Sequence, residues 1–310
     1  MRKSMMTAVV SALVMSLSSC NNDNEGSNQA TALKIQTDIA ATRATISSFP
    51  VNSALGLFVT SGALGSNYEA VSSNVNVKSL LSSGGVWTLS PAVYLSNDDA
   101  TVFAYYPYDA AKTNGTAIGV EHTSQTDFMY GTHTTGQNAI NNGNPTVNLT
   151  MKHALALVQF KMSESNFPGT GKLTKVEIAN GAGKTLLFSE GSMNLSSGAI
   201  TNTTGKNISA FVENTSTGLL ASIPAVASTD ESTYPKVMVL PTAASVAAGD
   251  LMIYFTIDGK VYSWSVPSAT TWKSGTKNTY SVTLSGTALT VGNVVITDWT
   301  GGVTGSAGLN

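Results

Sequence analysis

The chain has 310 residues, and only 11% of them are charged, against roughly 25% in a typical soluble domain. The formal net charge is −2 and the sequence has no run of lysines or arginines, which argues against nucleic-acid binding. Hydrophobic residues make up 42% of the chain, which is enough for packed cores and excludes general disorder. The length predicts about two domains.

Residues 1–19 have the features of an export signal. Arg2 and Lys3 precede an apolar stretch from Met5 to Met15 that is too short to span a bilayer. The stretch ends in "LSSC", which resembles a bacterial lipobox with Cys20 as the lipidated residue. The sequence therefore predicts a lipoprotein precursor held on a membrane by lipid on Cys20. Removal of residues 1–19 would change the net charge from −2 to −4. The alternative is a plain secretory signal with a chance cysteine.

A polar tether over residues 21–30 leads into the first predicted strand. Four residues of this strand alternate with polar ones and predict a half-buried face: Leu33, Ile35, Thr37 and Ile39. Arg43 follows, and it is the only arginine left once residues 1–19 are removed. Taken by itself, it is an exposed arginine between strands.

Short apolar runs separated by turn signals predict further strands. These runs cover residues 54–60, 75–81, 86–89, 92–95 and 101–108. A Gly/Asn/Thr-rich stretch over 131–144 predicts a boundary between an N-terminal domain (44–145) and a C-terminal domain (146–310). The apolar alternation after it shifts phase within 147–162, which predicts a bulge or a crossing between two sheets.

The pair Asp258-Gly259 predicts a two-residue hairpin turn, because both residue types tolerate positive φ. This turn places Ile253 opposite Trp264 and Phe255 opposite Tyr262 on one apolar face. An apolar face and a mixed face imply packing against a second sheet. We therefore expect an all-β fold of two β-sandwich domains with Greek-key-like connections.

The sequence offers little chemistry. The stretch "NGAGKT" (180–185) resembles the end of a phosphate-binding loop, but Ile178 stands where such a loop needs its first glycine. The three histidines are not spaced as metal ligands, and no nucleophile motif is present. We expect no enzymatic activity, no cofactor and no built metal site. A surface calcium site at the acidic pairs Asp98-Asp99 and Asp230-Glu231 is an open alternative.

Four features together resemble the fimbrillins of the FimA/Mfa-like type, the lipoprotein pilus subunits of Bacteroidetes. They are the lipobox with "ATRAT" after the tether, "VFAYYPY" followed by "DFMYGT", "VNLTMKHALALVQFKM", and the ending "WKSGTKNTYSVTLSGTALTVGNVVITDWTGG". The resemblance implies two transthyretin-like β-sandwich domains and a structural or adhesive role in a fimbria. The implied partners are other fimbrial subunits, an Arg-specific protease, the outer membrane and a surface ligand of host or bacterium.

The resemblance also implies an assembly route. The protease cuts between Arg43 and Ala44, the strand from Leu33 to Ile39 leaves, and a donor strand from another subunit fills the groove. The candidate donor carries Val294 and Ile296 on one parity, and on the other the residues Val295, Thr297 and Trp299. Trp299 belongs either to this donor or to the C-terminal core. The subunit type (stalk, tip or anchor) stays open, and a glycan-binding surface lipoprotein is the alternative function.

Overall fold

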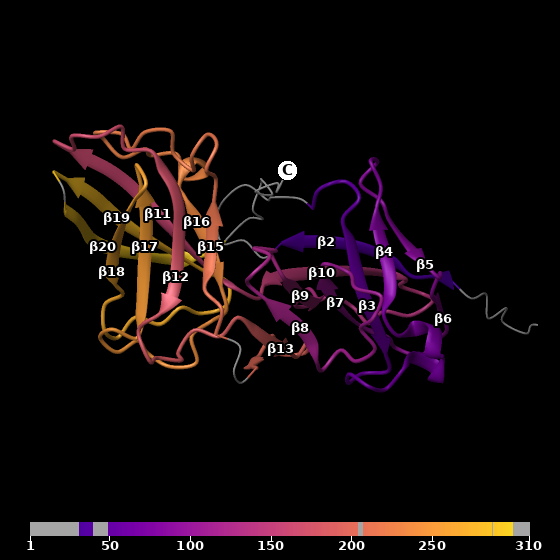
Figure 1. Ribbon diagram of the computed structural model, residues 1–310. Coiled ribbons are helices and arrows are strands. Elements are labelled where there is room, and N and C mark those ends of the chain that lie inside the picture. Colours follow the sequence, from indigo (N-terminus) through magenta and orange to yellow (C-terminus); the bar gives the residue numbers. More distant parts are fainter. Residues whose placement is uncertain (1–30, 40–48, 204–206, 287, 300–310) are drawn as a thin grey trace, which may run out of the picture.

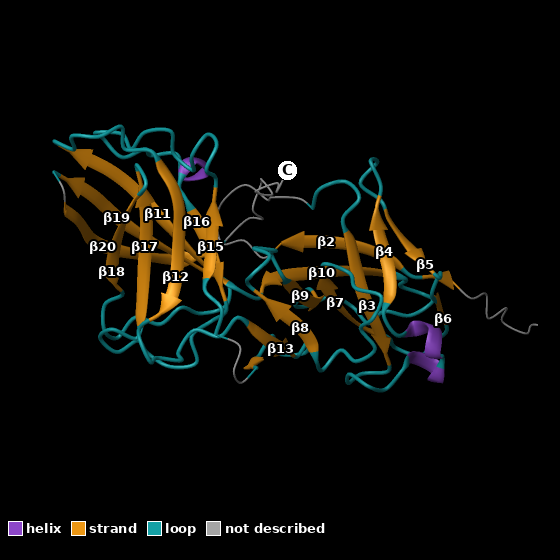
Figure 2. Cartoon of the chain, viewed as in Figure 1, coloured by secondary structure: helices purple, strands orange, loops and turns teal. Residues whose placement is uncertain are grey.

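The computed structural model describes residues 31–39, 49–203, 207–286 and 288–299, and these residues form an almost purely β protein (Figure 1, Figure 2). Helix is limited in the described part to three single 3-10 turns: Tyr68–Ala70, Ser72–Asn74 and Glu231–Thr233. Two β bodies lie side by side, one from each half of the chain. The all-β prediction with sandwich domains is therefore confirmed.

The N-terminal body is built on a seven-stranded sheet. In spatial order its strands are β2 (Lys34–Ile39), β10 (Thr146–His153), β9 (Met129–His133), β7 (Thr101–Tyr106), β3 (Ala54–Thr60), β4 (Val77–Leu81) and β5 (Trp87–Ser90). The sheet curls until its two edge strands meet. Trp87 Nε1 on β5 donates a hydrogen bond to Thr37 Oγ1 on β2 at 3.1 Å and joins the two edges. Apolar residues from every strand fill the space inside the curl.

A second, three-stranded sheet covers the outer face of the curled sheet. It consists of β14 (Ile200–Asn202), β13 (Glu190–Met193) and β8 (Ile118–Glu121). Phe58, Phe103 and Tyr105 on the outer face pack against this layer. β13 comes from the C-terminal half of the sequence and pairs antiparallel with β8 from the N-terminal half, so the two halves share a sheet (Figure 1).

The C-terminal body is a sandwich of two four-stranded sheets. One sheet contains β16 (Lys236–Val239), β11 (Ala156–Ser165), β19 (Thr276–Ser285) and β20 (Ala288–Asp298). The other contains β15 (Ala210–Glu213), β12 (Leu173–Asn180), β17 (Leu251–Ile257) and β18 (Lys260–Ser265). Phe160 meets Phe255 edge to face between the sheets, and the buried Trp272 donates from Nε1 to the Tyr280 hydroxyl at 3.1 Å.

The predicted hairpin has the register that its sequence required. β17 and β18 pair Ile253 with Trp264 and Phe255 with Tyr262. Asp258 and Gly259 both have positive φ, at 47° and 75°. The apolar face of this hairpin is buried in the core of the C-terminal sandwich.

The division between the two bodies differs from the boundary that the sequence suggested. β10 pairs with β9 and with β2, so residues 146–153 lie in the N-terminal sheet. The chain crosses to the C-terminal sandwich at Ala154 and Leu155, and β11 begins at Ala156. The phase shift therefore marks a crossing between two sheets, as predicted. The Gly/Asn-rich stretch is instead a folded β9–β10 connection, in which Ile140 is fully buried and its carbonyl accepts from Ala100 N at 2.7 Å.

We expect Gly259→Ala to lower the free energy of unfolding by about 1–2 kcal/mol, because an L-residue is strained at positive φ. No heavy atom lies within 4 Å of a Cβ built at Gly259, so the cost is a backbone cost alone. Gly84→Ala, on a turn without a positive φ, is the matched control and should change stability by less than about 0.5 kcal/mol. Urea unfolding measures both, and equal effects would contradict the backbone explanation.

Candidate strand-exchange site

The N-terminal segment of the described chain enters the curled sheet as its edge strand. β1 (Thr31–Ala32) pairs with β6 (Tyr94–Leu95), and Leu33 N donates to the Val93 carbonyl at 2.9 Å. β2 then runs parallel to β10, with Ile35 opposite Val147. β10 is the only sheet neighbour of β2 among the described strands.

The side chains of this segment alternate between the core and the solvent. Leu33, Ile35 and Ile39 are 5%, 7% and 6% exposed. Thr37 is half-buried and accepts the bond from Trp87, so it ties β2 to the opposite edge of the curl. Burying one aliphatic side chain contributes roughly 1.5–3 kcal/mol, so three of them make residues 33–39 a substantial part of this core. The four residues predicted for the displaced strand thus lie together in one row.

The C-terminal strand β20 is docked at the edge of the C-terminal sandwich, antiparallel to β19 (Figure 1). The register shifts within this pair: Val282 lies opposite Val291, but Tyr280 lies opposite Val294. Two consecutive residues of β20 therefore lie opposite the single residue Ser281, which is a β-bulge. Before the bulge the odd-numbered residues of β20 lie on the core side of the sheet, and after the bulge the even-numbered residues lie there.

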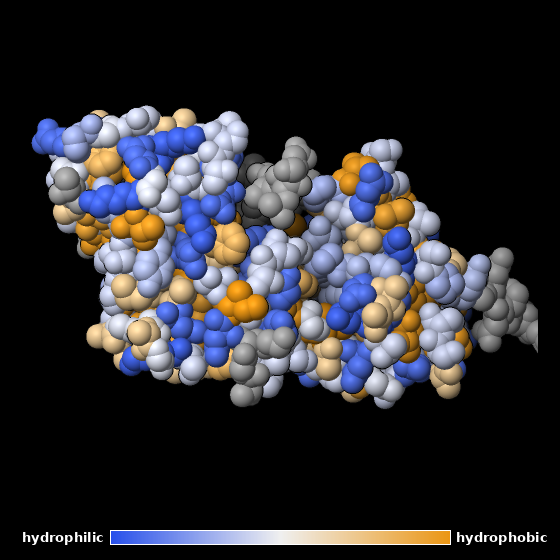
Figure 3. All heavy atoms as spheres, viewed as in Figure 1, coloured by the Kyte–Doolittle hydropathy of each residue, from blue (hydrophilic) through white to orange (hydrophobic). Residues whose placement is uncertain are grey.

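The apolar residues after the bulge are exposed. Val294, Val295 and Ile296 have 38%, 57% and 53% of their surface accessible. Before the bulge, Leu289 and Val291 pack partly buried against the sandwich core. In the space-filling view, apolar spheres lie among polar ones on the near face of this sandwich, which the sheet of β12, β17 and β18 forms (Figure 3). An edge strand with exposed valines and isoleucine is a template for pairing with another chain.

Trp299 is buried, unlike the exposed residues Val294 to Ile296. It is 4% exposed, and its ring stacks on His153 at the end of β10 with centroids 4.0 Å apart and planes 2° apart. His153 Nδ1 lies 2.9 Å from Asp127 Oδ1, and Trp299 N donates to the Gly275 carbonyl at 2.6 Å. Trp299 therefore belongs to a small core at the junction of the two bodies, with Leu155, Leu157, Met238 and Leu240.

Three of the predicted site residues lie outside the described residues: Cys20, Arg43 and Ala44. Their lipidation and cleavage stay predictions. In the described ranges, no cluster of three or more His, Cys, Asp or Glu side chains is arranged to hold a metal ion. No helix there is long and apolar enough to cross a bilayer.

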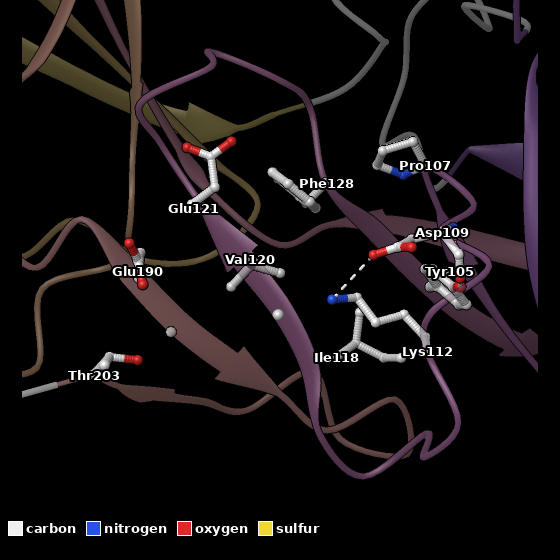
Figure 4. Close-up of a pocket in the computed structure, with 12 residues that line it drawn as sticks. Tyr105, Pro107, Asp109, Lys112, Ile118, Val120, Glu121, Phe128, Glu190 and Thr203 are labelled. Atoms are coloured by element: carbon white, nitrogen blue, oxygen red, sulfur yellow. Dashed lines mark hydrogen bonds and ion pairs between the residues drawn. The ribbon is translucent and has the colours of Figure 1, made fainter. Parts of the chain in front are cut away.

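A cavity of about 530 Å³ lies where the two halves of the chain meet along β8 and β13 (Figure 4). Ile118 and Val120 point into it, and Lys112 at its side pairs with Asp109 at 3.1 Å. Burial raises the pKa of Glu121, but hydrogen bonds from Ser124 and Thr123 outweigh this effect and hold that pKa below its usual value. Lys112, Asp109 and Glu121 are therefore paired with neighbouring protein groups, and these contacts stabilise the local structure.

A shallower hollow of about 420 Å³ lies on the outer face of β12, β17 and β18, beside Tyr254. A carboxylate next to an aromatic ring is the kind of surface that the glycan-binding alternative requires. Here Glu177 accepts from Lys175 Nζ at 2.6 Å and from Ser209 at 2.7 Å. Lys175 Nζ also lies 4.5 Å from the ring centroid of Phe211. The groups that would hold a sugar bind one another.

The comparisons with known proteins agree with this fold. A sequence profile described as fimbrillin-like matches residues 42–299. No curated protein matches the chain. A structure from Bacteroides uniformis, described as a candidate cell adhesion protein, is 21% identical with a TM-score of 0.62 over 87% of this chain and 99% of that one. A similarly described structure from Bacteroides ovatus is 18% identical with a TM-score of 0.60 over 88% and 98%. At these identities the likeness shows the fold.

We expect Ile35→Ala to lower the free energy of unfolding of the N-terminal body by about 2–4 kcal/mol, because it empties a buried pocket between β2 and β10. Gln36→Ala is the matched control, since Gln36 is exposed on the same strand and should change stability by less than about 0.5 kcal/mol. Chemical denaturation of the uncut protein measures both. Equal stability of the two variants would mean that β2 is not part of the core.

The pKa of Tyr105 predicts how stability changes at alkaline pH. Burial raises this pKa from 10.0 to about 12, so the folded protein holds the phenol proton more tightly than the unfolded chain. The resulting stability is complete below pH 10 and is lost as the pH rises towards 12. We expect Tyr105→Phe to be less stable overall, because the hydroxyl bonds Asn76 Oδ1 at 2.8 Å, but to lose stability less steeply in this window. A slope unchanged by the substitution would contradict the assignment.

Proposed function

We propose, from the premise that this chain belongs to the fimbrillin-like family, that it is a structural or adhesive subunit of a cell-surface fimbria and assembles by donor-strand exchange. The observation that carries the proposal is β2. It is an edge strand that, with Leu33 just before it, fills the N-terminal core with three buried aliphatic side chains, and it ends four residues before the only arginine of the mature chain. Such a strand blocks assembly while it is in place and opens a groove when it leaves.

Processing supplies the trigger. The precursor is held in the outer membrane by lipid on Cys20, and an Arg-specific protease cuts between Arg43 and Ala44. Because β2 ends at Ile39, this cut separates it from β3 and leaves it bound by non-covalent contacts only. The intact chain keeps β2 at a high effective concentration beside β10, and the cut removes that advantage. A strand from another subunit can then compete for the groove.

β20 has the properties of the strand that is donated. It lies at a sheet edge, at the C-terminal end of the described chain, and three consecutive apolar residues from Val294 to Ile296 are exposed on it. Transfer to a groove would bury apolar surface that the monomer leaves in water. The chain thus holds both a removable filler and a transferable strand, which are the two parts that a stalk subunit needs. The role is structural, and the implied location is the outer membrane for the precursor and the extracellular fimbrium for the cut subunit.

Cleavage at Arg43 tests this function. We expect an Arg-specific protease to cut the folded mature protein at this bond alone and to produce SDS-resistant ladders, because the rest of the mature chain has no arginine. Arg43→Ala should fold normally but stay monomeric, and Arg43→Lys should do the same while keeping the positive charge. Gel electrophoresis and size-exclusion chromatography measure the outcome. Polymers of uncut Arg43→Ala, or wild-type protein that is cut and stays monomeric, would refute the function.

A further inference from the structure

The strand proposed as donor repeats the sequence pattern of the strand that it would replace. Residues 31–39 read "TALKIQTDI", and residues 287–295 read "TALTVGNVV". The inward-facing residues of the first segment correspond in order to four residues of the second: Leu33, Ile35, Thr37 and Ile39 to Leu289, Val291, Asn293 and Val295. Both rows consist of aliphatic residues with one polar residue in third place. At an offset of 256 residues the two segments share the opening Thr-Ala-Leu and the same order of aliphatic and polar residues along this row.

β20 cannot use this pattern where it is docked. An unbroken strand places Leu289, Val291 and Val295 on one face. The bulge opposite Ser281 breaks that face, so Leu289 and Val291 pack on the core while Val295 is 57% exposed. In residues 33–39, every aliphatic residue of the corresponding row is buried. The residues of β20 therefore fit the place of β2 better than their own.

We propose that residues 289–295 of a second copy of this chain replace residues 33–39, parallel to β10, with each donor residue at the position of the residue 256 before it. This register rests on the proposed function, and it specifies the partner and the alignment of the exchanged strand. Leu289 takes the place of an identical leucine. Val291 and Val295 are smaller than the isoleucines they replace, so they enter the pockets without overpacking. Asn293 takes the place of Thr37, and both residue types can accept the hydrogen bond that Trp87 donates.

A competing register lies four residues away. It matches "IQTDI" (35–39) to "VITDW" (295–299), which share Thr-Asp. In that register Asn293 would occupy the pocket of Leu33, and Trp299 that of Ile39, both of which are buried. A buried amide without a partner and an indole in a pocket shaped for isoleucine are both unfavourable. The first register avoids both.

Two aspartate substitutions test which face of the donor is buried. Val295→Asp would put a charge in the pocket of Ile39, whereas Val294→Asp would reproduce the exposed Asp38. Both valines are exposed in the monomer, so both variants should fold, and circular dichroism checks this. After cleavage at Arg43, we expect Val295→Asp to polymerise at least ten-fold more slowly than wild type and Val294→Asp to match wild type. The reverse order would overturn the proposal.

Cysteine pairs decide between the two registers. Cleavage removes Cys20, the only natural cysteine, and Thr146 on β10 lies opposite Lys34. The proposed register brings residue 290 of the donor to that position, and the competing one brings residue 294. We therefore expect disulfide-linked subunits in polymers of Thr146→Cys with Thr290→Cys, and none with Val294→Cys in place of Thr290→Cys; neighbouring strands allow this bond. Uncut protein is the control, because β2 still occupies the position.

The outcomes separate the two proposals. Polymers that cross-link only through the Val294→Cys pair overturn the register and leave donor-strand exchange standing. Polymers that cross-link through neither pair also overturn the register and leave donor-strand exchange standing. Cut wild-type protein that neither polymerises nor captures a synthetic peptide of residues 288–299 overturns strand exchange, and the register falls with it.

Discussion

The parallel pairing of β2 with β10 is the contact on which the N-terminal body depends. β10 gives one edge to β9 and the other to β2, with six residue pairs on the β2 side. Without residues 33–39 the backbone groups on that edge lose their partners, and the pockets of three aliphatic side chains open to water. Parallel neighbours cannot be joined by a tight turn, so the two strands lie far apart in sequence. β2 comes first in the sheet along the chain and can leave without unthreading any other strand.

β10 also carries the junction between the two bodies. It ends at His153, and the next residues cross into the C-terminal sandwich. The ring of His153 stacks on Trp299, which lies directly after β20, and Leu155 packs in the same small core. The strand that pairs with β2 along Thr146–Met151 therefore also contacts, at its last residue, the segment that follows β20. The bonds of Gln125 to Met238 N at 2.7 Å and O at 2.9 Å brace this junction from the opposite half of the chain.

The sequence predicted the features whose physical causes are local. The row from Leu33 to Ile39 has a period of two, and the Asp258-Gly259 turn fixes the register of its own hairpin. The partners of these elements could not be predicted in the same way. β13 pairs with β8 across 69 to 75 residues of sequence, and a four-residue strand with a glycine in it has no pattern that identifies its partner. The bulge opposite Ser281 also has no local signal, so the two parities of β20 stayed unresolved.

The bulge shows how one strand can suit two environments. In its own sheet, β20 needs Leu289 and Val291 on the core side and then, past the bulge, Tyr280 opposite Val294. In a straight strand Leu289 and Val291 share one face with Val295, and Asn293 is the one polar residue between them. A sequence optimised only for the edge of the C-terminal sandwich would place polar residues at the exposed positions, as natural edge strands usually do. β20 instead keeps valine and isoleucine there, and their apolar surface is exposed to water. In the proposed exchange, a groove that buries this surface would favour transfer of the strand.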